Sequence, residues 1–238
     1  MAIKRRGVEG AAFAEQWRIR LRRWQAVRDE LLFPQLADLM PRTSHSSACD
    51  VGCGEGSTTR ALLAVVPASC TVTAIDVNQT LLEACKKSSG ERVQSALVDL
   101  RKPVKLGKTF DLLLCCNVLM FLDDSAVGTA VNWFRTHLSM AGVLIVSIVH
   151  PCWTLAANRD PLPESLPESA EFPVGWDSVD AMLYYRTIEW YSRTFSKYGF
   201  TVERDTIISL PERAERFGNR FRGKDGWPVY WVAKTSLL

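Results

Sequence analysis

The residues with the clearest chemical potential form a glycine-rich segment at positions 50–56, whose sequence is Asp-Val-Gly-Cys-Gly-Glu-Gly. The segment follows a short apolar run and precedes a stretch with helical character. Glycines at alternate positions let the main chain turn tightly and let a ligand approach the backbone. The start of the following helix offers free N–H groups and the positive end of its dipole. The spacing therefore predicts a ligand-binding loop.

The dinucleotide fingerprint G-x-G-x-x-G is the main alternative for this loop. After Gly54 it requires a glycine at position 57, but the chain has Ser57 there, and its extra glycine is Gly56. An acid, Asp50, also precedes the first glycine. Asp76 ends the next predicted strand, where a carboxylate can accept hydrogen bonds from both hydroxyls of a ribose. NAD enzymes use the same geometry, so the glycine spacing is the discriminating feature.

Acid-x-Gly-x-Gly-x-Gly, with further landmarks at the ends of the next three predicted strands, resembles the class I (Rossmann-like) S-adenosylmethionine-dependent methyltransferase family, of the small-molecule type. The resemblance covers roughly residues 45–235. It implies that S-adenosylmethionine is the cofactor, that Asp99 binds the adenine amino group, and that the segment at Asn117 runs under the methionine part. The implied cofactor-binding set is Asp50, Gly52, Cys53, Gly54, Asp76, Val77, Asp99, Leu100, Asn117 and Val118.

Candidate catalytic residues follow the fifth predicted strand and are His150, Tyr184 and Tyr185. His150 stands at the carboxyl end of a strand, where it would act either as a general base or only as a hydrogen-bonding partner of the following segment. The tyrosines would either stabilise a cation through their ring faces or pack in the core. Further substrate-side candidates are Trp17, Trp24, Trp153 and Tyr191.

Three functions are consistent with this resemblance. The first is transfer of a methyl group to a small-molecule acceptor. The second uses the cofactor as the substrate of an intramolecular cyclisation that releases methylthioadenosine. The third is a catalytically silent cofactor-binding protein. The product separates them, because methyl transfer yields S-adenosylhomocysteine and the silent protein yields nothing.

The order of elements predicts an α/β fold, with a Rossmann-like, seven-stranded, mostly parallel sheet, helices on both faces and an N-terminal helical cap. We expect the cap in residues 1–45 and the cofactor-binding domain in residues 46–238, with a proline-rich lid insertion at 151–181. The predicted strands are residues 48–51, 71–75, 93–98, 110–115, 143–149, 200–208 and 229–233. The predicted helices are residues 11–40, 57–66, 78–87, 125–138 and 185–198.

The composition indicates which kinds of partner and ligand the protein is expected to have. The net charge of +3 is too small to indicate a nucleic-acid partner. Eight basic residues crowd positions 4–28, either as a solvated helix face or as an attraction for an acidic substrate or a phosphate. Seven cysteines without a C-x-x-C pair, and no signal peptide, predict a cytoplasmic protein. We expect no metal, because the three histidines lack ligand spacing, and no membrane span, because the longest apolar run is too short.

Overall fold

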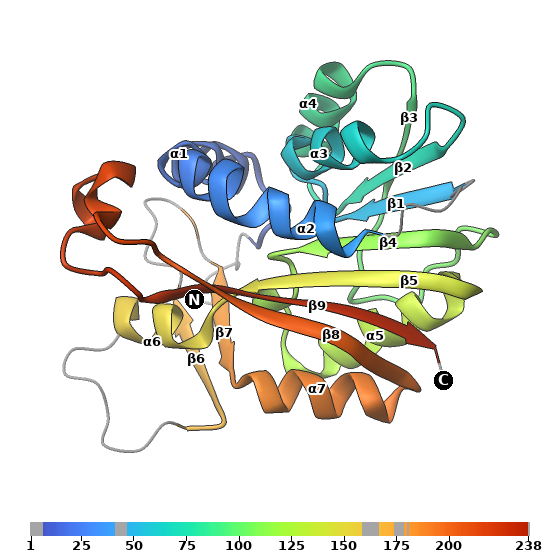
Figure 1. Cartoon of the computed structure of the whole chain (residues 1–238). Helices are drawn as coiled ribbons and strands as arrows, with labels where there is room; N and C mark the ends of the chain where they lie inside the picture. The colour runs from blue at the N-terminus through green and yellow to red at the C-terminus, as the bar shows by residue number, and fades with distance from the viewer. Residues whose placement is uncertain (1–6, 41–46, 159–166, 174–178, 180, 238) are drawn as a thin grey trace, which may run out of the picture.

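A seven-stranded sheet forms the centre of the computed structural model, which describes residues 7–40, 47–158, 167–173, 179 and 181–237 (Figure 1). The strand order is β3-β2-β1-β4-β5-β9-β8. The first five strands in that order pair in parallel, and β9 is antiparallel to both of its neighbours. The strands are β1 (Ser47–Val51), β2 (Thr71–Asp76), β3 (Val93–Leu97), β4 (Phe110–Cys116), β5 (Leu138–Val149), β8 (Phe200–Ser209) and β9 (Pro228–Leu237).

Helices cover both faces of this sheet, which confirms the predicted fold class (Figure 1). One face packs against the N-terminal helices and α3 and α4, and the other packs against α5 and α7. The α-helices are α1 (Ala11–Val27), α2 (Phe33–Leu39), α3 (Ser57–Val65), α4 (Gln79–Ser89), α5 (Asp124–His137), α6 (Pro151–Asn158) and α7 (Ile188–Lys197). Shorter turns are the π-helical η1 (Arg28–Leu32) and the 3-10 helices η2 (Leu119–Phe121), η3 (Ala214–Phe217) and η4 (Asn219–Phe221).

Local sequence signals explain where the central elements begin. The Asn78 side chain caps α4 by accepting a hydrogen bond from the Leu81 N–H (3.1 Å). Asp123 caps α5 in the same way. The central strand β4 is an almost unbroken apolar run because it is covered on both faces, as parallel strands usually are. No helix in the described ranges is long and apolar enough to cross a membrane.

The region after β5 differs from the sequence prediction in two ways. Residues 151–181 were expected to lack helix and strand, but they begin with α6 and include β6 (Ser169–Pro173). Pro151 was interpreted as a sign of a loop, but proline is well tolerated in the first turn of a helix, and here it begins α6. The helix predicted over 185–198 begins later, at Ile188, because Tyr184 and Tyr185 belong to β7 (Met182–Arg186), which pairs antiparallel with β6.

The N-terminal segment is tied to the sheet domain near the start of α4. The Asn78 Nδ2 atom donates hydrogen bonds to the carbonyl oxygens of Val8 (2.8 Å) and Gly10 (3.0 Å). Glu9 forms an ion pair with Arg101. These contacts hold the beginning of α1 above the carboxyl ends of the parallel strands. The predicted boundary at residue 45/46 lies outside the described residues, as do residues 159–166, 174–178 and 180 of the predicted 151–181 lid.

Candidate cofactor and acceptor site

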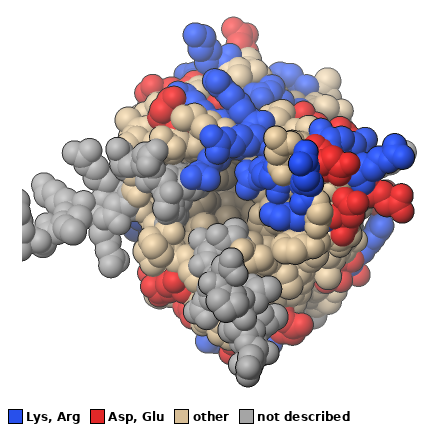
Figure 2. All heavy atoms as spheres, turned by 90° about the vertical axis from the view of Figure 1, so that its left-hand side faces the viewer, with Lys and Arg blue, Asp and Glu red and all other residues tan. Residues whose placement is uncertain are grey.

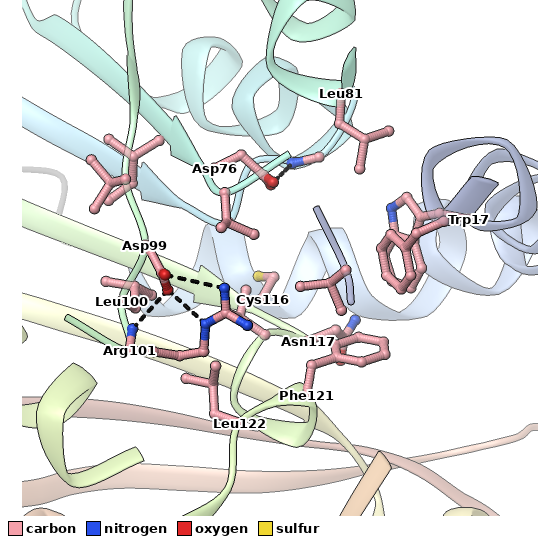
Figure 3. Close-up of a pocket in the computed structure, with 18 residues that line it drawn as sticks. Trp17, Asp76, Leu81, Asp99, Leu100, Arg101, Cys116, Asn117, Phe121 and Leu122 are labelled. Carbon is pink, nitrogen blue, oxygen red and sulfur yellow. Dashed lines mark hydrogen bonds and ion pairs between the residues drawn. The ribbon is translucent and has the colours of Figure 1, made fainter. Parts of the chain in front are cut away.

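A cavity of about 740 Å³, including space open to solvent, lies at the carboxyl ends of β1, β2, β3 and β4 (Figure 3). We call it the first cavity. Its size is within the roughly 300–1,000 Å³ typical of small-molecule sites. It contains eight of the ten predicted cofactor-binding residues, namely Gly52, Gly54, Asp76, Val77, Asp99, Leu100, Asn117 and Val118. It also contains Val8, Phe13, Trp17, Ile75, Leu81, Val98, Arg101, Cys116, Phe121 and Leu122.

The glycine loop and Asp76 hold each other in place. One carboxylate oxygen of Asp76 accepts a hydrogen bond from the Gly54 N–H, and the other accepts one from the Asn78 N–H, both at 2.8 Å (Figure 3 shows the first). Burial nevertheless raises the pKa of this carboxyl. Gly52 has φ = 72°, and a Cβ atom there would lie 2.2 Å from a methyl group of Val118. Only glycine therefore lets the loop approach the end of β4.

Asp99 has a partner that the sequence analysis did not anticipate. Arg101 donates hydrogen bonds to both of its carboxylate oxygens, at 2.8 Å from Nε and 3.1 Å from Nη2 (Figure 3). Burial raises the pKa of Asp99, but the hydrogen bonds from Arg101 outweigh it, and the net pKa is lowered. The carboxylate is thus held ionised at the cavity wall, and the guanidinium of Arg101 adds a planar cation beside it.

Aromatic side chains from α1 and η2 close the first cavity from above. Phe13 and Trp17 lie one turn apart on α1, with ring centroids 5.9 Å apart. Both meet the ring of Phe121 edge-on, at 5.6 and 5.8 Å. The helical period of α1 puts Phe13 and Trp17 on one face, which is why a single helix supplies this cover. Trp17 was a sequence candidate for the substrate side, whereas Phe121 was not.

Asn117 combines backbone strain with an unpartnered polar atom. Its φ of 58° lies in the left-handed region, which is uncommon for residues other than glycine. Its N–H donates to the Ser147 carbonyl (2.8 Å), which fixes the strand end. Its Oδ1 atom is buried and has no hydrogen-bond partner within the described structure. Such strain and an unsatisfied acceptor are typical of a ligand site.

The remaining two predicted cofactor residues, Asp50 and Cys53, are buried and are not among the described residues that line the cavity. The Asp50 Oδ2 atom accepts hydrogen bonds from the hydroxyls of Thr58 (2.7 Å) and Thr59 (2.6 Å) at the start of α3. Its Oδ1 atom is buried and has no hydrogen-bond partner in the part of the chain that the structure describes. Burial raises the pKa of Asp50 to about 7, despite the two hydroxyl donors that lower it. Asp50 therefore supports the loop from below.

This shift predicts a pH-dependent stability. The folded chain holds a proton on Asp50 up to about pH 7, whereas an unfolded aspartate releases it near pH 3.9. The raised pKa of Asp50 therefore adds fully to the free energy of unfolding below about pH 4, and this stabilisation is lost as the pH rises to about 7. Its slope is at most about 1.4 kcal/mol per pH unit. Urea unfolding between pH 4.5 and 8 should show this component in the wild type and not in Asp50→Asn. Parallel pH profiles of the two proteins would contradict it.

A second cavity of about 770 Å³, again including space open to solvent, adjoins the first. Three residues, Trp17, Asn117 and Phe121, line both. Trp24 of α1 and Trp153 of α6 meet at its wall, with ring centroids 5.2 Å apart. The structure thus brings the N-terminal helix and the start of the predicted lid together. The other described residues of its wall are Arg20, Leu21, Arg28, Met120, Val149, Thr154, Leu183, Arg220 and Tyr230.

The three predicted catalytic residues lie elsewhere, and none is among the described residues that line either cavity. The His150 Nδ1 atom accepts a hydrogen bond from the Cys152 N–H (3.2 Å), and burial lowers the pKa of its ring. Tyr185 is buried in a small apolar cluster. Tyr184 is half-buried, and the Arg186 guanidinium carbon lies 5.2 Å from the centroid of the Tyr184 ring. A catalytic role for these residues stays a prediction.

Several wall residues carried signals that the sequence analysis passed over. Phe13 belongs to the apolar period of α1, and Arg28 belongs to the N-terminal basic run. Arg101 directly follows the Asp99-Leu100 landmark, and Phe121 follows Asn117 by one helical turn. Arg220 and Tyr230 had no such signal, because they come from the far end of the chain. Within the described ranges, no group of His, Cys, Asp and Glu could hold a metal ion.

The sheet order, the glycine loop after β1 and the acids after β2 and β3 define the class I, Rossmann-like methyltransferase fold. Residues 48–142 match the family model of a methyltransferase domain. No curated protein is similar enough in sequence to match.

Solved structures share the fold at low sequence identity. One is an S-adenosylmethionine-dependent methyltransferase from Mesorhizobium loti, with a TM-score of 0.71, 18% identity, and coverage of 85% of this chain and 95% of that one. A methyltransferase from Clostridium acetobutylicum has a TM-score of 0.65 and 14% identity, over 92% and 98% of the chains. The glycopeptide N-methyltransferase MtfA, complexed with S-adenosylmethionine, has a TM-score of 0.62 and 18% identity, over 87% and 92%.

Residues 48–142 thus match a methyltransferase domain, and the chain has the fold of S-adenosylmethionine-dependent methyltransferases. The predicted fold is thereby confirmed, and the family match supports the predicted enzyme class and cofactor. The cyclisation alternative receives no support from these relatives. The small-molecule acceptor, the individual site residues and the cytoplasmic location stay predictions.

Proposed function

We propose that this protein transfers the methyl group of S-adenosylmethionine to a small-molecule acceptor held in the second cavity. The observation that supports this most is the wall shared by the two cavities, formed by Trp17, Asn117 and Phe121. Molecules in adjoining cavities can bring reacting atoms to the roughly 3–3.5 Å that a near-attack arrangement needs. The modest net charge of +3 argues against a nucleic acid as the acceptor.

The first cavity fits the cofactor by its donor and acceptor groups. Each carboxylate oxygen of Asp76 accepts one backbone N–H and keeps a lone pair for a ribose hydroxyl. Apolar side chains between Asp76 and Asp99, including Val98 and Leu100, offer a surface for the adenine ring. The buried Oδ1 atom of Asn117 lacks a donor within the described structure and can accept one from a bound ligand.

Bound S-adenosylmethionine supplies an electrophilic methyl group, whose bond electrons stay on sulfur when the methyl carbon bonds to a lone pair of the acceptor. The protein's own part is to bind, orient and exclude water. Phe13, Trp17 and Phe121 cover the meeting point of the cavities. Asn117 stands at this point and orients an N–H or O–H donor. We propose that these residues, rather than His150, Tyr184 or Tyr185, surround the reacting atoms.

The test is the identity of the sulfur-containing product. Purified protein is incubated with S-adenosylmethionine, with and without pools of small-molecule acceptors, and the products are separated by chromatography and mass spectrometry. We expect S-adenosylhomocysteine that forms only when an acceptor is present, together with an acceptor heavier by one methyl group. Methylthioadenosine without an acceptor would establish the cyclisation instead, and no product with any pool would leave a silent binding protein.

A further inference from the structure

Arginine side chains from three separate parts of the chain converge on the second cavity. Arg20 belongs to α1, Arg28 begins η1, and Arg220 belongs to η4, about 190 residues later. None of the described residues that line this cavity is an aspartate or a glutamate. Buried or clustered cations normally have carboxylate partners, because their mutual repulsion and desolvation are unfavourable. Arg28 and Arg220 have no carboxylate partner within the described part of the chain, so the wall carries positive charge at these two side chains that is not neutralised locally.

Arg28 shows this most clearly. Its side chain is only 5% exposed. Its two terminal nitrogens donate to neutral acceptors, Ser57 Oγ (3.1 Å) and Gln25 Oε1 (2.9 Å), and its buried Nε atom has no partner among the described residues. Burial lowers the pKa of its guanidinium, as expected for a cation with too few compensating charges. Arg28 thus presents a desolvated cation with an unused N–H donor.

Arg220 is a second cation without a carboxylate partner in the described structure. Its guanidinium lies 4.7 Å from the ring centroid of Trp24. Burial, and then the positive charges of Arg20 and Arg23, lower its pKa. Acids are present nearby but are used by other arginines: Glu55 pairs with Arg18, and Glu30 pairs with Arg216.

The same charge is visible on the surface. Figure 2 shows Lys and Arg side chains gathered around a hollow on the face that lies at the left of Figure 1, where the orange-red turns η3 and η4 are found. An open hollow on the chain's surface is lined by Arg20, Arg23, Phe217, Gly218, Asn219 and Arg220. It shares Arg20 and Arg220 with the second cavity, so the positive charge extends from the interior to the mouth. Such a field draws anions toward the site.

The rest of the wall is aromatic. Trp17, Trp24, Phe121, Trp153 and Tyr230 contribute rings to the second cavity. Trp24 packs edge-on against both Trp153 (5.2 Å) and Tyr230 (6.1 Å). Broad ring surfaces favour a flat or otherwise apolar ligand body. The cavity therefore combines aromatic rings with arginine side chains in one wall, and the planar guanidinium suits carboxylate and phosphate oxygens.

We propose that the methyl acceptor is a small anion, with a carboxylate or phosphate held by Arg28 and Arg220 and an aromatic or apolar body against Trp24 and Trp153. This inference rests on the proposed function, because it treats the second cavity as the acceptor site. The anionic group then lies at the arginines, and the nucleophile points to the Asn117 end that adjoins the first cavity. The N-terminal basic run accordingly serves in part as a substrate-binding feature.

Matched pairs of small molecules test the charge. Binding of benzoate, indole-3-acetate and phenyl phosphate to the protein saturated with S-adenosylhomocysteine is measured by calorimetry, beside benzamide, indole-3-acetamide and phenol as neutral counterparts. We expect at least one acid to bind at least about tenfold more tightly than its neutral counterpart, with an affinity that falls as salt is raised. The carboxylate and phosphate arms show which anion the arginines prefer. Binding by none of the acids, or equal binding of acids and neutral counterparts, would overturn the proposal.

Variants assign the anion to its arginine. Arg220→Gln removes a solvent-accessible cation on η4 and should weaken acid binding about tenfold, while binding of the neutral compounds and of S-adenosylhomocysteine is unchanged. Arg222→Gln is the matched control, because Arg222 is exposed two residues away and lines neither cavity. Equal effects of Arg220→Gln and Arg222→Gln on acid binding would refute the assignment of the anion to Arg220.

Two further outcomes separate this inference from the proposed function. Methylation of neutral acceptors without anion binding would support the proposed function and reject this inference. Anion binding without S-adenosylhomocysteine formation in any pool would reject the function instead.

Discussion

Asp76→Ala should weaken the binding of S-adenosylmethionine by about 2–4 kcal/mol, which corresponds to a roughly 30- to 1,000-fold higher Kd. Two effects add. The ribose hydroxyls lose a charged acceptor, and the Gly54 and Asn78 N–H groups lose the oxygens that they contact at 2.8 Å. The glycine loop is then less well held in the shape that receives the ligand. Calorimetric titration of the purified variant measures the loss.

Two further variants serve as controls for the Asp76→Ala experiment. Asp76→Asn keeps one carbonyl oxygen and should fall between the wild type and Asp76→Ala. Asp38→Ala removes an exposed carboxylate that pairs with Arg204 and lines neither cavity, so its affinity for the cofactor should equal that of the wild type. Thermal unfolding without ligand should remain cooperative in every variant. An unchanged Kd for Asp76→Ala would place the ribose contact on another residue.

Arg186→Ala should lower the free energy of unfolding by about 3–5 kcal/mol. The Arg186 side chain is fully buried and donates to the carbonyl oxygens of Leu122 (2.6 Å) and Leu119 (3.4 Å) and to Asp124 (2.8 Å). Its guanidinium also lies 4.6 Å from the ring centroid of Trp190. The substitution leaves two carbonyl oxygens without this donor and creates a cavity between β7 and η2. Urea unfolding gives the magnitude.

The chain offers a matched control for this arginine. Arg193 is 65% exposed and pairs with Glu168 at the surface, so Arg193→Ala should cost less than about 1 kcal/mol. Asp124→Asn should also cost little, because Asp124 is 63% exposed and the amide oxygen still accepts. Arg186→Ala should in addition raise the Kd for S-adenosylmethionine, since the carbonyls that it holds flank Phe121 in the wall of the first cavity. Equal destabilisation by Arg186→Ala and Arg193→Ala would show that the buried hydrogen bonds of Arg186 stabilise the fold no more than a surface ion pair does.

Secondary structure was predictable where local signals agreed and was wrong where they conflicted. The strands β1, β2, β4 and β5 are apolar or β-branched runs, and the caps Asn78 and Asp123 mark the helices between them. After β5, the prolines pointed to a loop, yet Pro151 begins α6. Thr187, which accepts a hydrogen bond from the Trp190 N–H (3.2 Å), was an available signal for the true start of α7. The pairing of β6 with β7 joins separate segments and leaves no such local mark.

By itself, the sequence indicated the fold class and identified eight of the residues that line the first cavity. The reason is topological: in a parallel sheet, residues that end successive strands meet at one edge, so Gly52, Asp76, Asp99 and Asn117 come together from their order alone. The second cavity depended on tertiary structure. Arg28 and Arg220 line the same cavity only because η1 and η4, which are far apart in the sequence, pack at the same place in the fold. No spacing along the chain encodes that meeting, because it arises from the packing of whole elements.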